Sequence, residues 1–375
     1  MKALKITLSV LVLLVLILVI AIVSASFLID PNRLKPILIN EVAKKTDYNL
    51  AIDGALTWSF YPLLGVHVEH MTLSAPKQTT PFLDLNDVTV ATKLADLLQS
   101  KDKVSGELRI ASVNLGKLHL EKAAVDLHWE NQVVTLSPIK AQLYDGYFTG
   151  VAHGAALSST TPKWDWDVVI DQVQIKPLLE DVNGADSKVK LSGVGRVALK
   201  ASAQGSSKQA IFATLNGLGS VDVQHGSVEG VDLNYFVQTA DALINKQPIN
   251  PPASIGETVF DSLNGNIVIK NGVVGTNDLL LQAPSLKAIA AGEINLNYST
   301  MNLALNVSPQ NVKTEWEIPV LIIGDIARPD VRLDMTEVNK FLVKQNLEKV
   351  KDKISKEIEK VPGEAGKFLK KLLGN

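Results

Sequence analysis

The segment Val125-Asp126-Leu127-His128-Trp129-Glu130 alternates strictly between apolar and polar residues. Because successive side chains of a β-strand point to opposite faces, this period of two predicts a strand with one apolar and one polar face. The same alternation recurs at 108–110, 294–298 and 302–307. Most of the chain is therefore expected to form antiparallel strands rather than alternating strands and helices.

Glycine-containing dipeptides separate these strand-like runs. They are Asp53-Gly54, Asp145-Gly146, His225-Gly226 and Asn271-Gly272. Each places a glycine where a tight hairpin requires a positive φ. We therefore predict a hairpin at each of the four positions, and a mainly β fold in the form of an antiparallel meander.

Helical patterns are fewer than strand patterns. Short helices are expected at 175–181, 208–215 and 233–244, the last closed by a cluster of prolines. A longer helix of about 25 residues is expected near the C-terminus, because apolar residues recur there in steps of three and four. Its apolar stripe consists of Val343, Leu347, Val350, Ile354, Ile358 and Val361.

The N-terminus begins with an uncharged run of 24 residues, from 6 to 29. As a helix it would be about 36 Å long, enough to cross a bilayer with some tilt. Lys2 and Lys5 precede the run, so the N-terminus is expected in the cytoplasm and the body on the other side of the membrane. A cleavable signal peptide, with small residues at 24–26, is the alternative.

Composition and motifs exclude several classes of function. The 375 residues include 37 basic and 39 acidic residues and no cysteine. This balance does not favour a nucleic-acid partner, and the lack of cysteine excludes disulfides and thiol chemistry. The sequence contains no P-loop, no GxSxG and no HExxH motif. We therefore expect neither an enzyme nor a cofactor.

Two clusters of polar residues contain the residue types of metal or acid–base sites. In His67-Val68-Glu69-His70, strict alternation would place His67 and Glu69 on one face and His70 on the other, so no shared metal is expected. Trp164-Asp165-Trp166-Asp167 offers two neighbouring carboxylates. The alternative interpretation, which we favour, is a strand whose tryptophans pack inward while its aspartates are solvated. No metal site is therefore predicted.

A sheet with one apolar face must bury that face. Two sheets could pack as a sandwich, or one curved sheet could form an apolar trough that accommodates an apolar ligand. Composition leaves both open. If a trough forms, alternation predicts its lining: Leu108, Ile110, Val125, Leu127, Trp129, Ile294, Leu296, Leu303, Leu305 and Val307. A slip of one residue in register would move these side chains to the outer face.

Two stretches of sequence resemble one known family. The first contains Asp30-Pro31-Asn32, Lys35-Pro36 and the run 53–65, with Asp53, Gly54, Trp58, Ser59, Phe60, Pro62 and Gly65. The second contains 226–233, Leu263-Asn264-Gly265 and 277–284. Both stretches, in this order, closely resemble the AsmA family of Gram-negative bacteria.

The resemblance implies a single-pass protein of the inner membrane with a β-rich body in the periplasm. Larger relatives are thought to hold phospholipids in a long, taco-shaped groove and to carry them to the outer membrane. The expected function is thus phospholipid binding or transfer in outer-membrane biogenesis, with phospholipids, the inner membrane and outer-membrane or envelope proteins as partners. The alternative is a non-enzymatic assembly or scaffold factor for outer-membrane proteins.

The expected organisation has four parts: an anchor at 1–29, an N-terminal β region at 30–205, a C-terminal β region at 206–335 and a basic helical tail at 336–375. The tail contains ten lysines and six acidic residues. Its helix could cap the sheet, contact an anionic membrane or bind a partner helix. Spanning a periplasm of roughly 200 Å would need about 40 strands, more than this chain can supply.

Overall fold

The computed structural model describes residues 30–46, 48–59, 63–76, 78–92, 103–157, 159, 161–184, 186–249, 256–310 and 317–359. The expected anchor at 1–29 lies outside these residues. Among the described residues, no helix combines the length and apolar character needed to cross a membrane.

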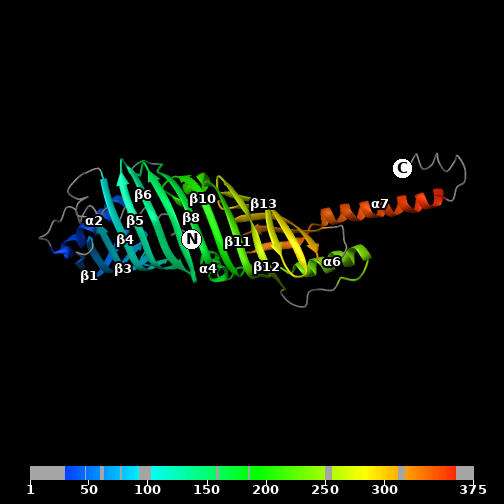
Figure 1. The fold of residues 1–375 in the computed structure, drawn as a ribbon, viewed down its shortest axis with the longest axis horizontal. Helices are drawn as coiled ribbons and strands as arrows, with labels where there is room; N and C mark the ends of the chain where they lie inside the picture. The colour runs from blue at the N-terminus through cyan, green and yellow to red at the C-terminus, as the bar shows by residue number, and fades with distance from the viewer. Residues whose placement is uncertain are drawn as a thin grey trace.

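One elongated, twisted antiparallel sheet of 17 strands forms the body (Figure 1). Its strands are β1 Asn49–Ser59, β2 Leu64–Ser74, β3 Pro81–Thr92, β4 Lys103–Leu115, β5 Leu118–Glu130, β6 Val133–Leu143, β7 Gly146–Ala155, β8 Lys163–Gln174, β9 Lys190–Leu191, β10 Val194–Gln204, β11 Asn216–Glu229, β12 Glu257–Lys270, β13 Val273–Gln282, β14 Leu286–Asn295, β15 Thr300–Pro309, β16 Ile318–Asp325 and β17 Pro329–Leu333. The predicted mainly β, antiparallel fold is therefore confirmed.

Almost every strand pairs with its neighbour in sequence. The exception is β9, which lies beside β11, so that β8 pairs directly with β10. The remaining 16 strands form one ladder from β1 to β17. The predicted boundary between residues 205 and 206 falls between β10 and β11, two strands that pair with each other.

Two of the four predicted hairpins are correct. Asp145-Gly146 joins β6 to β7, and Asn271-Gly272 joins β12 to β13. The other two predictions are wrong, because Asp53-Gly54 lies within β1 and His225-Gly226 lies within β11. Gly54 (φ 73°) sits at a shift in register between β1 and β2, and His225 (φ 50°) occupies the left-handed region without ending its strand. Local left-handed residues can bend a long strand instead of reversing it.

The described helices are η1 Pro31–Arg33, α2 Leu34–Thr46, α4 Ile175–Asn183, α5 Lys208–Thr214, α6 Leu233–Asn245 and α7 Met335–Glu359. The three short helices predicted from sequence correspond to α4, α5 and α6. The long C-terminal helix is also confirmed and begins before its predicted stripe. Helix α2 was not predicted, although Leu34, Leu38 and Val42 recur every four residues and are all buried.

The buried apolar side chains share one face of the sheet, here called the inner face. They form one cluster around α2 and the first strands, and a second around α4, α6 and the last strands. The sheet curls over its own inner face in the second half. The Lys188 amide, just before β9, donates a 2.9 Å hydrogen bond to the carbonyl of Ala327 between β16 and β17. The apolar face is thus buried by the curling of a single sheet and not by the packing of two sheets in a sandwich.

Small residues line the inner face of the central strands. Gly150 of β7 and Gly217 and Gly219 of β11 stand where the flanking strands carry larger side chains. A Cβ atom added to Gly219 would lie 2.6 Å from the carbonyl oxygen of Ala198 and 3.0 Å from Ile267 Cγ1. Side chains converge on the concave face of a curved sheet, so glycine makes the curvature sterically feasible.

Candidate functional site

The inner face is the candidate site, and it carries nine of the ten residues of the predicted lining; the tenth, Leu296, lies in the turn after β14. On β4 and β5, Leu108, Ile110 and Leu127 are buried, while Val125 and Trp129 are half-buried next to them. These five belong to the N-terminal apolar cluster. Their contact with a lipid stays a prediction.

The other five predicted residues lie far along the sheet, on or directly after β14 and β15. Leu303, Leu305 and Val307 of β15 are buried in the second apolar cluster. Ile294 is the second-last residue of β14 and lies on the same face, and Leu296 follows that strand; both are half-buried. The structure therefore does not bring the two predicted groups together, because seven strands of the ladder lie between β5 and β14.

Sequence reasoning missed the residues that connect the two groups. Phe148, Ile170, Val197 and Val221 form a cross-strand row over β7, β8, β10 and β11, and all four are half-buried. Leu199 lies two residues further along β10 and is also half-buried. The signal was present in part, because Val197, Leu199, Ala201 and Ala203 stand at every second position, although Ala198 interrupts the alternation.

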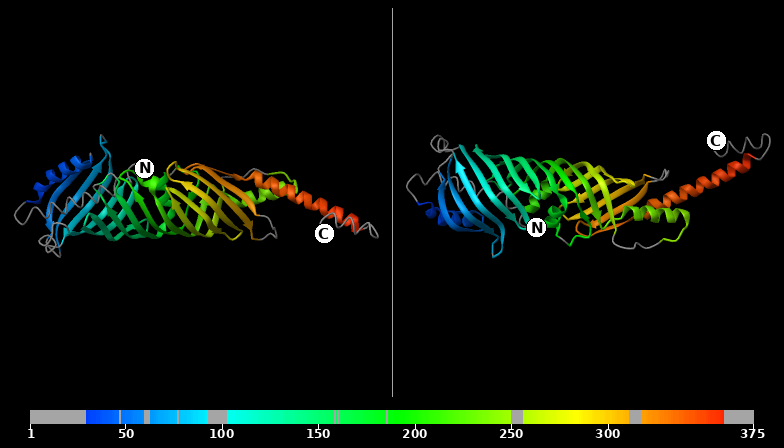
Figure 2. Two further views of the ribbon diagram at one scale, coloured as in Figure 1. Left: turned by 90° about the horizontal axis from the view of Figure 1, so that it is seen from above. Right: turned by 60° about the horizontal axis from the view of Figure 1, so that its bottom comes forward.

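Helices cover the inner face at three places. Helix α2 packs Leu38 and Val42 into the N-terminal cluster, and α6 packs against β12 and β15–β17 near the other end. Between them, Ile175 at the start of α4 lies against Gly195, where an added Cβ would come within 2.4 Å of Ile175 Cδ1. Figure 2 shows α2 at one end of the sheet and α6 and α7 at the other. The half-buried row lies between these coverings.

Helix α4 is fastened to the sheet by polar contacts. The Tyr144 hydroxyl, in the β6–β7 turn, donates a 2.5 Å hydrogen bond to Asp181. Burial, reinforced by this hydrogen bond, raises the pKa of Tyr144 to about 12. Lys190 binds Glu180 at 3.1 Å, and Lys176 binds Glu229 of β11 at 2.6 Å. These contacts hold the segment from α4 to β9 in place on the sheet.

The Lys176–Glu229 contact also affects the titration of both groups. The hydrogen bond from Lys176 lowers the pKa of Glu229, and the same bond raises the pKa of Lys176. Both side chains are substantially exposed. A solvated pair of this kind positions α4 more than it stabilises the fold.

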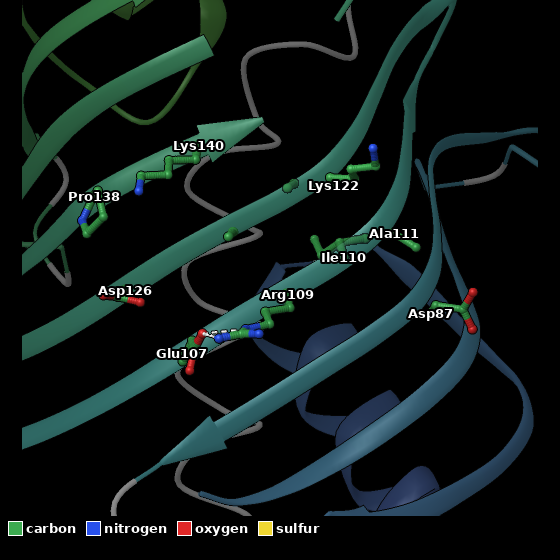
Figure 3. A pocket seen from close by; sticks show the side chains of 11 residues that line it. Asp87, Glu107, Arg109, Ile110, Ala111, Lys122, Asp126, Pro138 and Lys140 are labelled. Atoms are coloured by element: carbon green, nitrogen blue, oxygen red, sulfur yellow. Dashed lines mark hydrogen bonds and ion pairs between the residues drawn. The ribbon is translucent and has the colours of Figure 1, made fainter. Parts of the chain in front are cut away.

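The opposite, outer face carries charged and polar side chains, together with the exposed apolar residues Leu218, Val259, Val268 and Ile289. It contains a hollow of about 550 Å³ between β3 and β6, lined by Glu107, Arg109, Asp126 and Lys140 among others (Figure 3). Arg109 is bonded to Glu107 of the same strand. Acidic and basic side chains alternate around this hollow, so it selects no charged ligand and is not the candidate site.

One detail of the predicted polar clusters is wrong. His70 lies on the same outer face as His67, because the irregularity between β1 and β2 shifts the alternation, and Met71 rather than His70 points inward. His70 bridges Asp53 at 3.1 Å and Asp84 at 3.4 Å. Within the described ranges, no group of three acidic, histidine or cysteine residues could hold a metal ion.

The second polar cluster, Trp164-Asp165-Trp166-Asp167, forms a strand with its tryptophans inward and its aspartates outward, as favoured from the sequence. Trp164 is buried and donates its Nε1–H to the carbonyl of Gly205 at 3.2 Å, and Trp166 is half-buried on the same face. Asp165 and Asp167 are exposed on the outer face. The tryptophans therefore contribute to the apolar face and the aspartates to solubility.

The first family-like stretch, here called the first signature, comprises residues 30–36 and 53–65. It joins the N-terminal helices to the edge strand β1. The Asn32 side chain accepts a 3.0 Å hydrogen bond from the Leu56 amide and donates one of 3.4 Å to the Leu56 carbonyl. Lys35 donates to the carbonyl of Gly54. The two halves of the signature thus bind each other and close the free edge of the strand.

The remaining signature residues pack nearby or elsewhere in the sheet. Trp58 is half-buried against the N-terminal cluster, and Ser59 ends β1. Gly65 of β2 lies so close to β3 that an added Cβ would be 2.8 Å from Ala91 Cβ. Phe60 and Pro62 lie outside the described residues.

The second signature, Leu263-Asn264-Gly265, lies in the middle of β12. Leu263 is half-buried against the second apolar cluster. A Cβ on Gly265 would come within 2.8 Å of Leu279 Cα on β13. The glycine therefore permits close approach of the two strands.

Comparison with known proteins gives one family. The model of the AsmA family matches residues 1–105 and 92–279. No curated protein and no solved structure matches the chain significantly. With more than half of its residues matched to this one family model, the chain belongs to the AsmA family.

Proposed function

We propose that this protein binds phospholipid acyl chains on its inner face and transfers them in outer-membrane biogenesis. In this proposal, residues 1–29 anchor it in the inner membrane with the N-terminus in the cytoplasm, and the sheet lies in the periplasm. Membership of the AsmA family implies a place in the cell envelope and a generally non-catalytic role.

One observation carries the proposal: the apolar inner face is continuous along the ladder, and its central row is only half-buried. An acyl chain lying on Val197, Leu199 and Val221 would be removed from water, which contributes about 0.8 kcal/mol for each buried CH₂ group. The small residues of β7 and β11 leave this part of the concave face with short side chains. Headgroups would remain in solvent, so the site would favour long apolar chains over a particular headgroup.

The dimensions favour a partial bridge or a shuttle. Sixteen strands in one ladder have fifteen steps of about 4.8 Å, which gives a sheet of roughly 70 Å. A periplasm of roughly 200 Å is wider than that, so a single copy would need a second component or movement to deliver lipid to the outer membrane.

The proposal is tested by native mass spectrometry of the detergent-purified full chain. Leu199→Lys places a charge in the central row, whereas Leu218→Lys places the same charge on the outer face, where Leu218 is 64% exposed. We expect phospholipid to copurify with the wild type and with Leu218→Lys, and its occupancy to fall about tenfold in Leu199→Lys.

Absence of lipid from the wild type, or equal occupancy in the two variants, would contradict the proposal. A scaffold acting through strand edges would not depend on the inner face. If Leu199→Lys folds normally, loses lipid and still supports outer-membrane biogenesis in cells, the scaffold function is the correct one.

A further inference from the structure

Helix α7 leaves the sheet after its first two turns. Asp334 caps it by accepting hydrogen bonds from the amides of Thr336 at 2.9 Å and Glu337 at 3.4 Å. Val338 is fully buried against the sheet, at 0% exposure. Figures 1 and 2 show the rest of the helix projecting beyond the last strands, at the end of the molecule opposite α2.

The apolar stripe of α7 faces away from the sheet. Val343 and Leu347 follow Val338 by five and nine residues, which at about 100° per residue places them on the opposite side of the helix. They are 59% and 58% exposed, whereas Phe341 and Leu342 on the other side are half-buried. Val343 and Leu347 thus form an exposed apolar line on the outward side of the helix. The stripe therefore does not cap the sheet.

Lysines border this outward line. The exposed Lys340 and Lys344 lie on one side of it and the exposed Lys353 on the other, while Glu337 and Glu348 lie further round the helix. Lys340 also binds Glu337 at 2.7 Å. From 336 to 375 the sequence has four more lysines than acidic residues. An apolar line between basic borders is complementary to a surface that is apolar beneath and anionic above.

We propose that this outward face of α7 binds the surface of an anionic phospholipid bilayer. Val343 and Leu347 would enter the boundary between headgroups and acyl chains, and the bordering lysines would contact the anionic headgroups. A second copy is a poorer occupant, because pairing two such helices would oppose their lysine borders. The proposal does not depend on lipid binding at the inner face.

The test uses the full chain reconstituted into nanodiscs of zwitterionic lipid and mixed with separate vesicles. The vesicles contain either phosphatidylcholine alone or phosphatidylcholine with about 30% phosphatidylglycerol, and co-flotation measures tethering. Val343→Asp with Leu347→Asp removes the apolar line. The control, Lys349→Gln with Lys356→Gln, changes the net charge equally but on the side facing away from the line. Thermal unfolding verifies that both variants keep the folded sheet.

We expect the wild type to tether the anionic vesicles, the aspartate variant to lose tethering about tenfold or more, and the control to stay within about threefold of wild type. Equal tethering by the aspartate variant, or no tethering by the wild type, would overturn the proposal. So would self-association that depends on Val343 and Leu347, because a second copy would then be the occupant. None of these outcomes affects lipid copurification, so failure here is distinguishable from failure of the proposed function.

Discussion

At the scale of single residues, a few polar side chains complete a mostly apolar architecture. Asn32 is the clearest case, because its amide offers Leu56 one acceptor and one donor, as a neighbouring strand would. Strand β1 pairs with β2 on one side only, and unpaired strand edges promote aggregation. Asn32 therefore protects the N-terminal edge of the sheet.

Replacing Asn32 with alanine should weaken this edge by about 1–2 kcal/mol, because a part-buried amide and carbonyl lose their partners. Hydrogen exchange of the peptide containing Leu56 measures the effect, and we expect exchange about tenfold faster. Asn302→Ala, at an exposed position of β15, is the control and should leave the exchange of that peptide unchanged. Unaltered exchange in Asn32→Ala would show that another contact protects the edge.

Tyr144 gives a prediction about pH. Its pKa in the folded protein is raised to about 12 from an ordinary value near 10, chiefly by burial and then by its hydrogen bond to Asp181. A raised pKa means that its contribution to stability is fully present below pH 10 and is lost as the pH rises towards 12.

The corresponding experiment is urea unfolding of wild type and Tyr144→Phe between pH 8 and 12. Below pH 10 the variant should be less stable by about 1–2 kcal/mol, because Asp181 loses a hydrogen bond. Above pH 10 the difference between the two proteins should shrink. A difference that stays constant up to pH 12 would contradict the assigned role of Tyr144.

At the scale of elements, curvature depends on glycines in the central strands. Gly219→Ala should destabilise the protein by about 1–3 kcal/mol, because the new methyl group would meet the Ala198 carbonyl at 2.6 Å. Gly275→Ala on β13 is the matched control, since the nearest atom to its added Cβ, the carbonyl oxygen of Val268, is 3.7 Å away. We expect the control to be neutral or slightly stabilising in thermal unfolding. Equal effects would mean that backbone entropy, not crowding, governs these positions.

The strands and helices also show which parts of the fold the sequence could predict. Period-two alternation identified the strands and the inner face, because a half-buried strand exposes its pattern directly in the sequence. It failed at His70, because an irregularity in pairing shifts the alternation without any clear local signal. The glycine dipeptides failed at Asp53-Gly54 and His225-Gly226, because a left-handed residue can lie inside a long strand. Helix α2 was missed although Leu34, Leu38 and Val42 mark it, and the direction of the α7 stripe could not be known before Val338 was placed against the sheet.

At the scale of the whole molecule, one sheet performs the task that two packed layers perform in a sandwich. The sheet curls, and α2, α4 and α6 cover parts of the inner face that the curl leaves open. What separates the candidate site from an ordinary core is the half-buried row around Val197 and Leu199, which lies between these helices. The length of the sheet follows from the number of strands in the ladder, so this number sets the distance that the molecule can span.

The most direct test of lipid binding at the inner face is photo-crosslinking in cells along β5 and β10. Trp129 and Leu199 are suitable positions because they are half-buried on the inner face, whereas Leu127 is only 1% exposed. A photoreactive residue at Trp129 or Leu199 should form phospholipid adducts, and one at the outward neighbours Glu130 or Lys200 should not. Adducts of equal yield on both faces, or none at either inner position, would contradict the account.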